Sequence, residues 1–283
     1  MMSNDLSKVA ILLATYNGEY YLREQLSSLF EQTFKKWTLF VHDDGSKDKS
    51  LEIVSEFASK YNNVELLNFQ TGCGAKESFL TMLKIVEADY YFFCDQDDVW
   101  DPEKIETSLT QLKQLEDQHK KTMPIVVHSD MTVVDRNLNV IKKSFWEVMM
   151  IKPEYLNNFN RIGANCLVTG CTMCFNRAAK KATLFPAKNA VMHDIWITLC
   201  VAKSEGVIYA INKPLMKYRQ HDSNTIGAKD KRKEAKFSYK LLHLRKIANE
   251  NYSTYKMLRD LGYGSFAKYL YYKSKYRLYL LLK

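Results

Sequence analysis

The sequence lacks the features that mark several specialised classes of protein. Its six cysteines form neither the framework of a small disulfide-rich secreted domain nor the paired C-x-x-C spacing of a zinc site. Cys171 and Cys174 stand as a single C-x-x-C without a second pair, so reduced thiols are expected. No stretch reaches the ~18 consecutive apolar residues that span a membrane. The start, MMSNDLSK, carries an acid before the apolar run and makes a poor signal peptide, so we expect a cytoplasmic protein.

Low-complexity segments and internal repeats are also absent, and 46% hydrophobic with 26% charged residues is ordinary for a globular protein. The 283 residues suffice for one large domain, or for one domain with an appendage. The charge is unevenly distributed. Residues 228–283 carry 15 Lys/Arg and 4 Asp/Glu, a net charge of +11 within a total of +9. The body of the chain is therefore close to neutral, and its last part is basic.

The first hundred residues alternate between short apolar runs and segments with apolar residues at helical spacing. This alternation predicts a mainly parallel sheet covered by helices, an α/β fold. The expected strands are 8–16, a run within 37–46, 64–69 and 90–94, and the expected helices are 20–34, 50–61 and 75–88.

Polar residues follow the ends of several of these strands. In parallel sheets, ligands bind beyond the carboxyl ends of the strands, so such residues are expected to converge on one edge. The set comprises Thr15, Tyr16, Asn17, Asp43, Asp44, Asp95 and Asp97.

The segment YYFFCDQDDVW, residues 90–100, leads an apolar run directly into Asp95, Asp97 and Asp98. Carboxylates so close together repel one another, and Mg²⁺ or Mn²⁺ takes its ligands from one or two carboxylates plus substrate phosphates. The pattern therefore predicts a site for a metal-bound diphosphate. The alternative is that these acids only cap a helix opened by Pro102, although a cap needs a single Asp.

The second part of the chain is less regular. We expect a helix over 102–121, a strand over 124–130, a hairpin turn at 135–139, and loop with short helix over 144–164. Further expectations are strands on both sides of Gly170, helices over 178–182 and 191–203, and paired strands over 207–221.

Beyond His221 a polar stretch precedes a tail in which aromatics and leucines alternate with Lys and Arg at helical spacing. Such a basic amphipathic tail is expected to lie on an anionic membrane surface or to pack against a partner. An ordinary solvated helix face is the alternative.

Four motifs in order resemble those of a known family. They are TYNGEYYLREQLSSLFEQTF, VHDDGSKDKS, FFCDQDDVW, and the later pair HDIW and YRQHDSN. Together they make residues 8 to about 226 similar to the family 2 glycosyltransferases of the GT-A fold. The resemblance implies a GT-A domain over 1–226, with a nucleotide-binding half over about 1–100 and an acceptor-side half over about 101–226. Residues 227–283 would be a basic amphipathic helical extension.

The same resemblance assigns nucleotide-binding residues. The loop of Thr15, Tyr16 and Asn17 is similar to the one that closes over the base. Asp44 resembles the carboxylate that accepts a hydrogen bond from the ring NH of uracil or thymine, which selects a dTDP or UDP sugar. Asp95-Gln96-Asp97 matches the DxD motif, with Asp95 expected at the ribose and Asp97 at a Mg²⁺ or Mn²⁺ ion. Asp98 is left as a cap or a supporting residue.

Three later residues complete the expected site. His221 resembles the histidine that assists the metal or diphosphate, and Arg219 could pair with a phosphate. Asp194 resembles the catalytic base of inverting members, which takes the proton of the attacking acceptor hydroxyl. A helix-capping role for Asp194 is the alternative, and the two roles could coexist. His193 stands where the family often has Glu, which weakens inference about the acceptor.

The motifs DQDDVW and HDIW are most similar to those of bacterial rhamnosyltransferases that use dTDP-rhamnose for surface polysaccharides. UDP-galactose, UDP-glucose and UDP-N-acetylhexosamine remain alternative donors. A lipid-linked saccharide acceptor and a peripheral position on the inner face of the cell membrane would follow. A glycoside hydrolase, which needs no nucleotide, would leave the TYN and DDGS motifs unexplained. A nucleic-acid-binding protein is the other alternative, but the tail tyrosines fall at apolar spacing and no nucleic-acid partner is expected.

Overall fold

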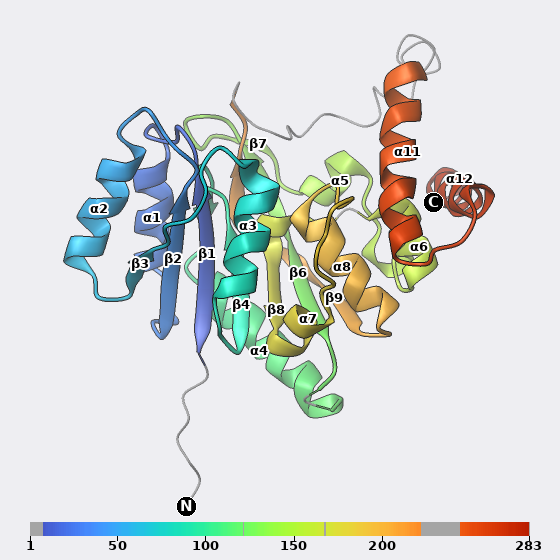
Figure 1. The fold of residues 1–283 in the computed structure, drawn as a ribbon, viewed down its shortest axis with the longest axis horizontal. Helices are drawn as coiled ribbons and strands as arrows, with labels where there is room; N and C mark the ends of the chain where they lie inside the picture. Colours follow the sequence, from blue (N-terminus) through green and yellow to red (C-terminus); the bar gives the residue numbers. More distant parts are fainter. Residues whose placement is uncertain (1–7, 121, 167, 222–243, 283) are drawn as a thin grey trace, which may run out of the picture.

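A computed structural model describes residues 8–120, 122–166, 168–221 and 244–282. Within these ranges the chain forms a nine-stranded mixed sheet with helices on both faces (Figure 1). The strand order is β3-β2-β1-β4-β8-β6-β9-β5, and β7 pairs with β6 outside this path. The predicted α/β sheet is therefore confirmed.

The first half of the sheet is parallel, as the alternation predicts. Its strands are β1 (Val9–Thr15), β2 (Trp37–Asp43), β3 (Val64–Leu66) and β4 (Tyr90–Cys94). The helices between them are α1 (Leu22–Phe30), α2 (Ser50–Lys60) and α3 (Gly74–Ile85). In the register of these pairs Thr15 lies opposite Asp43 and Leu13 lies opposite Cys94, so the three strands end at one edge.

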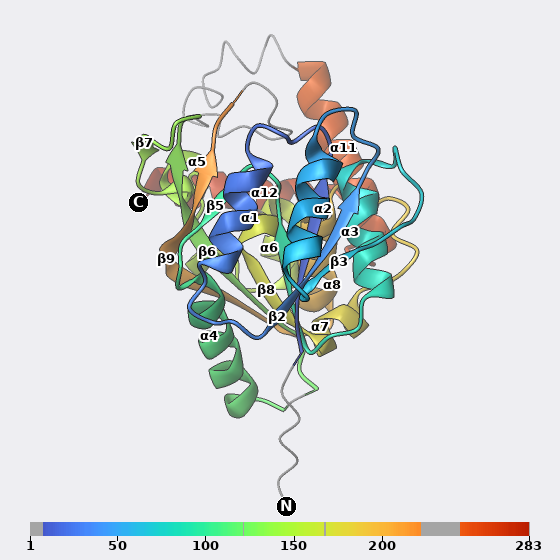
Figure 2. The same cartoon turned by 90° about the vertical axis from the view of Figure 1, so that its left-hand side faces the viewer.

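Strand β1 is apolar throughout because both of its faces are covered. Ile11 and Leu13 belong to the core cluster that includes Leu22 and Leu26 of α1, whereas Leu12 belongs to the opposite cluster with α3. Seen along the sheet, α1 and α4 lie on one side and α3 and α8 on the other (Figure 2). Burial on both faces removes the polar positions that would otherwise alternate along the strand.

The second half of the sheet is mixed. Strand β8 (Met173–Asn176) runs antiparallel to β4 and to β6 (Ile125–Val134), and β6 runs parallel to β9 (Val207–Arg219). Short strands β5 (Val99–Trp100) and β7 (Val140–Lys142) pair with β9 and β6 respectively. The hairpin turn before β7 is confirmed, with the Asp135 carboxylate accepting hydrogen bonds from the N–H groups of Asn137 and Asn139.

Two strand predictions are wrong. Residues 207–219 form the single long strand β9 rather than a pair of strands, with a register shift against β6 where Asp130 faces Pro214. The bulge lets the strand continue past a proline, which has no N–H to donate. Gly170 opens the 3₁₀ turn η2 (Gly170–Thr172) instead of lying between strands, so only β8 after it is a strand.

The remaining helices lie mostly after β5. They are α4 (Lys104–Gln118), α5 (Phe145–Met149), the 3₁₀ turn η1 (Pro153–Tyr155), α6 (Phe159–Asn165), α7 (Arg177–Ala182) and α8 (His193–Lys203). Helix α8 is buried on most sides, which explains why its sequence HDIWITLCVAK carries so few polar residues.

Two C-terminal helices, α11 (Leu244–Asp260) and α12 (Phe266–Leu282), lie beside α6 at one end of the molecule (Figure 1). Their tyrosines attach them to the body. The Tyr276 hydroxyl donates to the Met150 carbonyl at 2.7 Å and accepts from the Lys152 N–H at 2.9 Å, and buried Tyr263 donates to the Asn160 carbonyl. The predicted helical tail is confirmed, while the predicted boundary at 226/227 lies outside the described residues. None of the helices described here is long and apolar enough to cross a membrane.

Candidate active site

The acidic loop begins directly after β4, at the centre of the sheet. Asp95 and Asp97 are partly accessible, whereas Asp98 is fully buried. The N–H of Arg219, at the end of β9, donates to Asp98 Oδ1 at 3.2 Å. Helix α4 starts only at Lys104 with Glu103 at its N-cap, so the three acids do not cap it. The helix-cap alternative is therefore wrong, and Asp98 supports the loop from beneath.

Asp97 and His221 are brought into direct contact from opposite ends of the sequence. His221 Nε2 lies 2.8 Å from Asp97 Oδ2, and the imidazole ring packs on Tyr21 with a centroid separation of 4.6 Å. The side chain of Asp97 is 16% accessible. The two residues predicted as metal ligands thus share one position at the strand edge.

Arg219 lies next to this pair, but its guanidinium points into the protein. It is 2% accessible, and its nitrogens donate to Asp97 O at 2.9 Å, Arg136 O at 2.6 Å and Glu24 Oε2 at 2.5 Å. It also stacks over the Tyr21 ring at 4.7 Å. This geometry makes Arg219 a brace between the acidic loop and β9, and does not favour the predicted phosphate contact, which would require these bonds to be replaced.

Gln96, which the motif treats as a variable position, connects the acidic loop to the TYN loop. Its Oε1 accepts from Thr15 Oγ1 at 2.7 Å and from Tyr16 N at 2.8 Å, and its Nε2 donates to Tyr16 O at 3.1 Å. Gly18 leaves the space that this side chain needs, because a Cβ there would lie 2.3 Å from Gln96 Oε1. The role of Gln96 was not predicted from the sequence. Its only signal there is Gly18 after TYN, a residue without the Cβ that would collide with the Gln96 side chain.

The TYN loop in turn is tied to the DDGS loop. Asn17, with φ at 48°, accepts from Lys47 N at 2.9 Å through its side-chain oxygen, and its own N–H donates to Ser46 Oγ at 2.9 Å. Tyr16 is 53% exposed, so its ring is available to a ligand. Thr15, by contrast, is buried and its hydroxyl is bound to Gln96. Its expected role at a base is therefore indirect, through the position of the TYN loop.

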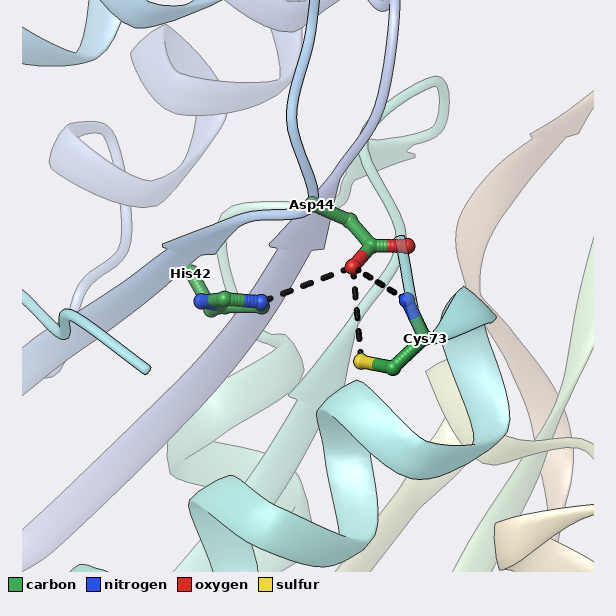
Figure 3. A group of neighbouring side chains, drawn as sticks. All are labelled: His42, Asp44 and Cys73. Carbon is green, nitrogen blue, oxygen red and sulfur yellow. Dashed lines mark hydrogen bonds and ion pairs between the residues drawn. The ribbon is translucent and has the colours of Figure 1, made fainter. Parts of the chain in front are cut away.

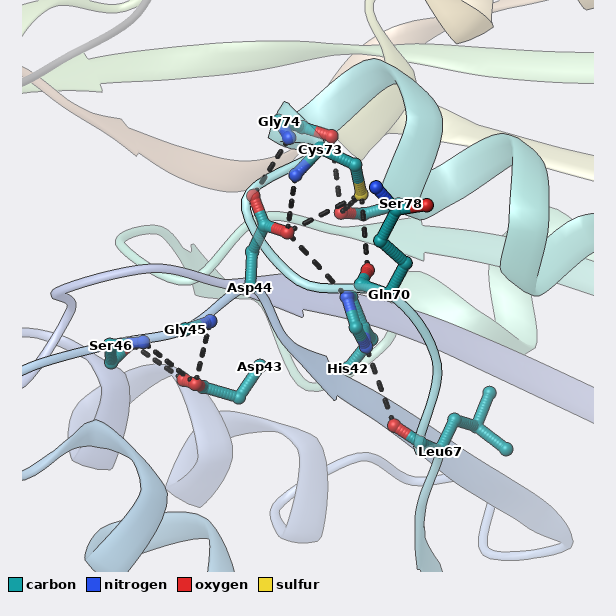
Figure 4. A network of polar contacts seen from close by, with 10 residues as sticks. All are labelled: His42, Asp43, Asp44, Gly45, Ser46, Leu67, Gln70, Cys73, Gly74 and Ser78. Atoms are coloured by element: carbon teal, nitrogen blue, oxygen red, sulfur yellow. Dashed lines mark hydrogen bonds and ion pairs between the residues drawn. The ribbon is translucent and has the colours of Figure 1, made fainter.

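The two acids of DDGS have different surroundings. Asp43 closes its own turn, since its carboxylate accepts from Gly45 N, Ser46 N and Ser46 Oγ. Asp44 turns the other way, toward His42 and Cys73, as Figure 3 shows. Figure 4 shows the wider network, in which the Asp44 carboxylate accepts from Cys73 N at 3.0 Å and Gly74 N at 2.8 Å.

Burial alone would raise the pKa of Asp44, but the hydrogen bonds from Cys73 and Gly74 outweigh it and leave that pKa below its ordinary value. Asp44 is therefore an ionised acceptor, the state that a ring N–H needs. Burial, with the nearby Asp44 carboxylate, raises the pKa of the Cys73 thiol and keeps it protonated.

The acidic loop, residues 95–98, holds carboxyl groups whose ionised forms are disfavoured. Burial raises the pKa of Asp95 to about 7, and the negative charges of Asp97 and then Asp194 contribute to the same shift. Burial likewise raises the pKa of Asp98 well above its ordinary value. Lys104, fully buried beneath the loop, donates to Cys171 O at 2.6 Å and supplies a positive charge that partly offsets these carboxylates. A cation bound at this loop would favour the ionised carboxylates and displace their protons.

Asp194 lies in the first turn of α8 and is 8% accessible. Its Oδ2 accepts from Gly170 N at 2.8 Å, and its Oδ1 accepts from Ile195 N at 2.7 Å. The N-cap position is Met192, so Asp194 is not the cap residue, although its bond to the Ile195 N–H satisfies one donor of the first turn. Gly170 precedes Cys171, whose thiol lies within 4.8 Å of a carboxylate oxygen of Asp95, so Asp194 is linked through η2 to the DxD motif.

His193 packs into an apolar layer beside Gly170. It is buried between Phe79 and Phe93, its two ring nitrogens have no hydrogen-bond partner, and burial lowers its pKa. A Cβ on Gly170 would lie 2.6 Å from His193 Nε2. The ring is thus an uncharged spacer that sets the position of α8 against η2.

The donor set fits a divalent cation. A carboxylate oxygen and an imidazole nitrogen converge at Asp97 and His221, and the carboxyl group of Asp95 lies on the same loop. Carboxylate ligands suit Mg²⁺ and Mn²⁺, with substrate phosphates completing the coordination. A cation there would replace the direct hydrogen bond between Asp97 and His221.

Comparison with known proteins identifies the family and the fold. The family model described as Glycosyl transferase family 2 matches residues 10–182. The dTDP-rhamnosyl transferase RfbG of Shigella flexneri is 29% identical over 229 residues, covering 76% of this chain and 74% of that protein.

Two solved structures share the fold at low sequence identity. TarS of S. aureus, residues 1–349 in complex with UDP-GlcNAc, has a TM-score of 0.56 and 22% identity over 77% of this chain and 60% of that one. The mannosyltransferase PcManGT of Pyrobaculum calidifontis, in complex with GDP-Man and Mn²⁺, has a TM-score of 0.54 and 14% identity over 77% of this chain and 58% of that one. The chain thus spans less than two thirds of either solved chain. On the family match and the fold, the chain belongs to glycosyl transferase family 2 and is a glycosyltransferase with a GT-A-like fold.

Proposed function

We propose that this glycosyltransferase inverts the anomeric centre of a pyrimidine nucleotide sugar in a single displacement, with a divalent cation at the DxD loop. The observation that carries the proposal is that Asp194 accepts a hydrogen bond from the Gly170 N–H at 2.8 Å, while the thiol of the next residue, Cys171, lies within 4.8 Å of a carboxylate oxygen of Asp95. This link supports a common space for the expected base and the expected diphosphate site, as direct transfer between a donor and an acceptor requires.

Asp194 would act as the general base. Its carboxylate is held by the N–H groups of Gly170 and Ile195, so its orientation is set before the substrates bind. It would take the proton of an acceptor hydroxyl as that oxygen attacks the anomeric carbon from the face opposite the diphosphate. The proton then resides on Asp194, and the nucleoside diphosphate departs.

Asp97 and His221 would hold the Mg²⁺ or Mn²⁺ ion, and Asp95 would lie at the ribose. When bound, the ion supplies charge neutralisation for the departing diphosphate. Arg219 keeps His221 over Asp97 through its bonds to Asp97 O and Glu24. The Mn²⁺ complex of the structurally similar mannosyltransferase supports this part of the proposal.

The donor would be dTDP-rhamnose. Support comes from the rhamnosyl transferase relative and from Asp44, an ionised acceptor beside the TYN loop that suits the ring N–H of thymine. The donors UDP-glucose, UDP-galactose and UDP-N-acetylhexosamine carry the same N–H on uracil, and the sugar is selected elsewhere in the pocket.

The acceptor would be a lipid-linked saccharide of a cell-surface polysaccharide, with the enzyme peripheral on an anionic membrane. Helix α12 supports this by exposing apolar side chains among its basic residues: Leu270, Tyr271, Leu278, Leu281 and Leu282. Lys275 and Arg277 are exposed on the same helix. Such a surface combines insertion of apolar groups with attraction to acidic headgroups.

A thermal-shift panel tests the donor and the cation. The chain is heated with dTDP-rhamnose, UDP-glucose, UDP-galactose or UDP-N-acetylglucosamine, each with and without Mn²⁺, because a ligand of the folded state raises the melting temperature. Cation-dependent stabilisation is expected with dTDP-rhamnose and is expected to disappear in Asp97→Ala. If no nucleotide sugar stabilises the chain in the presence of Mn²⁺, the proposed donor site is wrong.

Asp194→Asn tests the base separately from binding. This variant should keep the cation-dependent stabilisation by nucleotide sugar and lose transfer to acceptor. Retained turnover would remove Asp194 as the base.

Membrane binding is tested by sedimentation with vesicles. Lys275→Glu combined with Arg277→Glu should release the chain from vesicles that contain phosphatidylglycerol, whereas Lys84→Glu with Lys120→Glu makes the same change of charge elsewhere and should not. Tighter binding to oligonucleotide than to these vesicles at physiological salt would favour the nucleic-acid alternative.

A further inference from the structure

A second group of metal-ligating side chains lies on the β2 side of the nucleotide edge, away from the DxD loop. It consists of His42 at the end of β2, Asp44 just after it, and Cys73 at the start of α3 (Figure 3). One ligand atom from each residue lies within 4.8 Å of the others. The set combines nitrogen, oxygen and sulfur, and differs from the oxygen-rich surroundings of Asp95 and Asp97.

His42 has an unsatisfied nitrogen that points into this group. The ring is 1% accessible and stacks on Phe69 at a centroid distance of 3.5 Å. Nδ1 lies 3.4 Å from the Leu67 carbonyl, which can only accept, so this contact favours the tautomer with the hydrogen on Nδ1. In that tautomer Nε2 carries a lone pair. It has no hydrogen-bond partner and lies 3.7 Å from Asp44 Oδ1. Two acceptors facing each other in a buried place favour a cation between them.

The two distances to Asp44 Oδ1 are close to those around a small tetrahedral ion, and the ligand atoms of His42 and Cys73 lie within 4.8 Å of each other. Zn²⁺ takes sulfur at about 2.3 Å and nitrogen or oxygen at about 2.0–2.2 Å, which puts neighbouring ligand atoms about 3.4–3.6 Å apart. Cys73 Sγ lies 3.3 Å from Asp44 Oδ1, and His42 Nε2 lies 3.7 Å from the same oxygen. Cys73 is only partly buried, so solvent can supply a fourth ligand.

We propose that His42, Asp44 and Cys73 form a binding site for Zn²⁺ or a similar borderline transition-metal ion. The site is separate from the Mg²⁺ or Mn²⁺ position, because hard cations select oxygen ligands while thiolate and imidazole select Zn²⁺. Binding would displace the thiol proton of Cys73 into the buffer and leave a thiolate on the metal. A second consequence rests on the proposed function: an ion at Asp44 would occupy the place where the pyrimidine ring meets that carboxylate, so Zn²⁺ would compete with the nucleotide.

Cobalt binding to the full chain tests the site without any assay of transfer. Co²⁺ replaces Zn²⁺ and gives a thiolate-to-cobalt charge-transfer band, which the wild-type chain should develop on titration. Cys73→Ser should abolish the band. His42→Phe, which keeps a flat ring against Phe69, should weaken Co²⁺ binding by more than about tenfold, since loss of even an outer-shell partner costs ~10–100-fold.

Cys166→Ser is the matched control, because Cys166 is the other partly buried cysteine and lies far from this group in sequence. It should leave the band unchanged. A band that persists in Cys73→Ser, or that never appears in the wild-type chain, would overturn the proposal. Circular dichroism melts of each variant establish that it is folded before titration.

Competition is measured separately, by calorimetric titration of dTDP with and without Zn²⁺ in the presence of excess Mg²⁺. Weaker dTDP binding in Zn²⁺ is expected for the wild-type chain and not for Cys73→Ser. If the cobalt band appears but Zn²⁺ does not weaken dTDP binding, the metal site is supported and the assignment of Asp44 to the nucleotide pocket is wrong. Competition that persists in Cys73→Ser would instead place the inhibitory ion elsewhere and overturn its assignment to this group.

Discussion

Gln96 and Thr15 are joined by a hydrogen bond of 2.7 Å although they lie 81 residues apart. The contact makes the middle residue of the acidic motif the support of the TYN loop, because Gln96 also binds both backbone groups of Tyr16. The two loops expected at the base and at the diphosphate are therefore connected. A substitution in one loop should alter the position of the other.

Replacing Gln96→Ala should lower both stability and nucleotide binding. Thr15 Oγ1 and Tyr16 N would lose their acceptor, and an unsatisfied buried donor costs ~1–3 kcal/mol. The melting temperature and the affinity for dTDP are the measurements. Gln114→Ala, an exposed glutamine of α4, serves as control and should change neither. Unchanged dTDP affinity in a destabilised Gln96→Ala chain would limit the role of this residue to folding.

Gly18→Ala should be destabilising through the same contact. A Cβ at position 18 would lie 2.3 Å from Gln96 Oε1, so the amide would have to leave its partners. In the double variant Gly18→Ala with Gln96→Ala the obstructing side chain is gone. A thermodynamic cycle over the four chains should therefore give a coupling of about 0.5–3 kcal/mol, as for residues in contact. If the losses in free energy of unfolding of the two single variants add up in the double variant, a steric clash between position 18 and Gln96 is not the cause.

Acid sensitivity should be reduced by His128→Gln. Burial lowers the pKa of His128 from 6.5 to about 4, and its Nδ1 has no hydrogen-bond partner. Because the folded pKa lies below the unfolded one, the neutral ring's contribution is present above pH 6.5 and is lost as the pH falls toward 4. That loss amounts to roughly 3 kcal/mol at pH 4.

Urea unfolding at pH 7 and pH 4 measures this effect. The wild-type chain should lose more free energy of unfolding between the two pH values than His128→Gln does. His119→Gln, at an exposed histidine, should behave as the wild type. Equal pH dependence in all three chains would show that His128 does not stay neutral in the folded protein.

Arg219→Met separates a positioning role from phosphate binding. The change removes the bonds to Asp97 O, Arg136 O and Glu24, and should lower the free energy of unfolding by about 1–3 kcal/mol. Because the brace holds the acidic loop near His221, Mn²⁺ affinity should fall even without nucleotide.

Glu24→Gln, which releases only the outer end of the brace, should lower Mn²⁺ affinity in the same direction and by less. Calorimetric titration of Mn²⁺ measures both variants. If Arg219→Met weakens binding only when a diphosphate is present, the phosphate contact would be the correct role for Arg219.

The sequence alone indicated the strands that end at the active edge, because residues buried on both faces must be apolar without interruption. Through its resemblance to a family, it also led to the prediction that Asp95 and Asp97 have separate roles, which the proposed experiments test. Paired strands were expected over 207–221, whereas the structure has the single strand β9. Pro214 is accommodated where the register against β6 shifts, a feature that depends on pairing with a distant strand.

What the sequence determined by itself is the order of the elements and the place of the carboxylates after β2 and β4, since both follow from local periodicity. The tertiary structure decided which way the side chains at this edge point. Arg219 turns inward because Glu24, 195 residues away, pairs with its guanidinium. Asp44 faces His42 and Cys73, whereas neighbouring Asp43 closes its own turn. Such choices depend on contacts between distant segments, and those contacts exist only once the sheet has brought the strand ends to one edge.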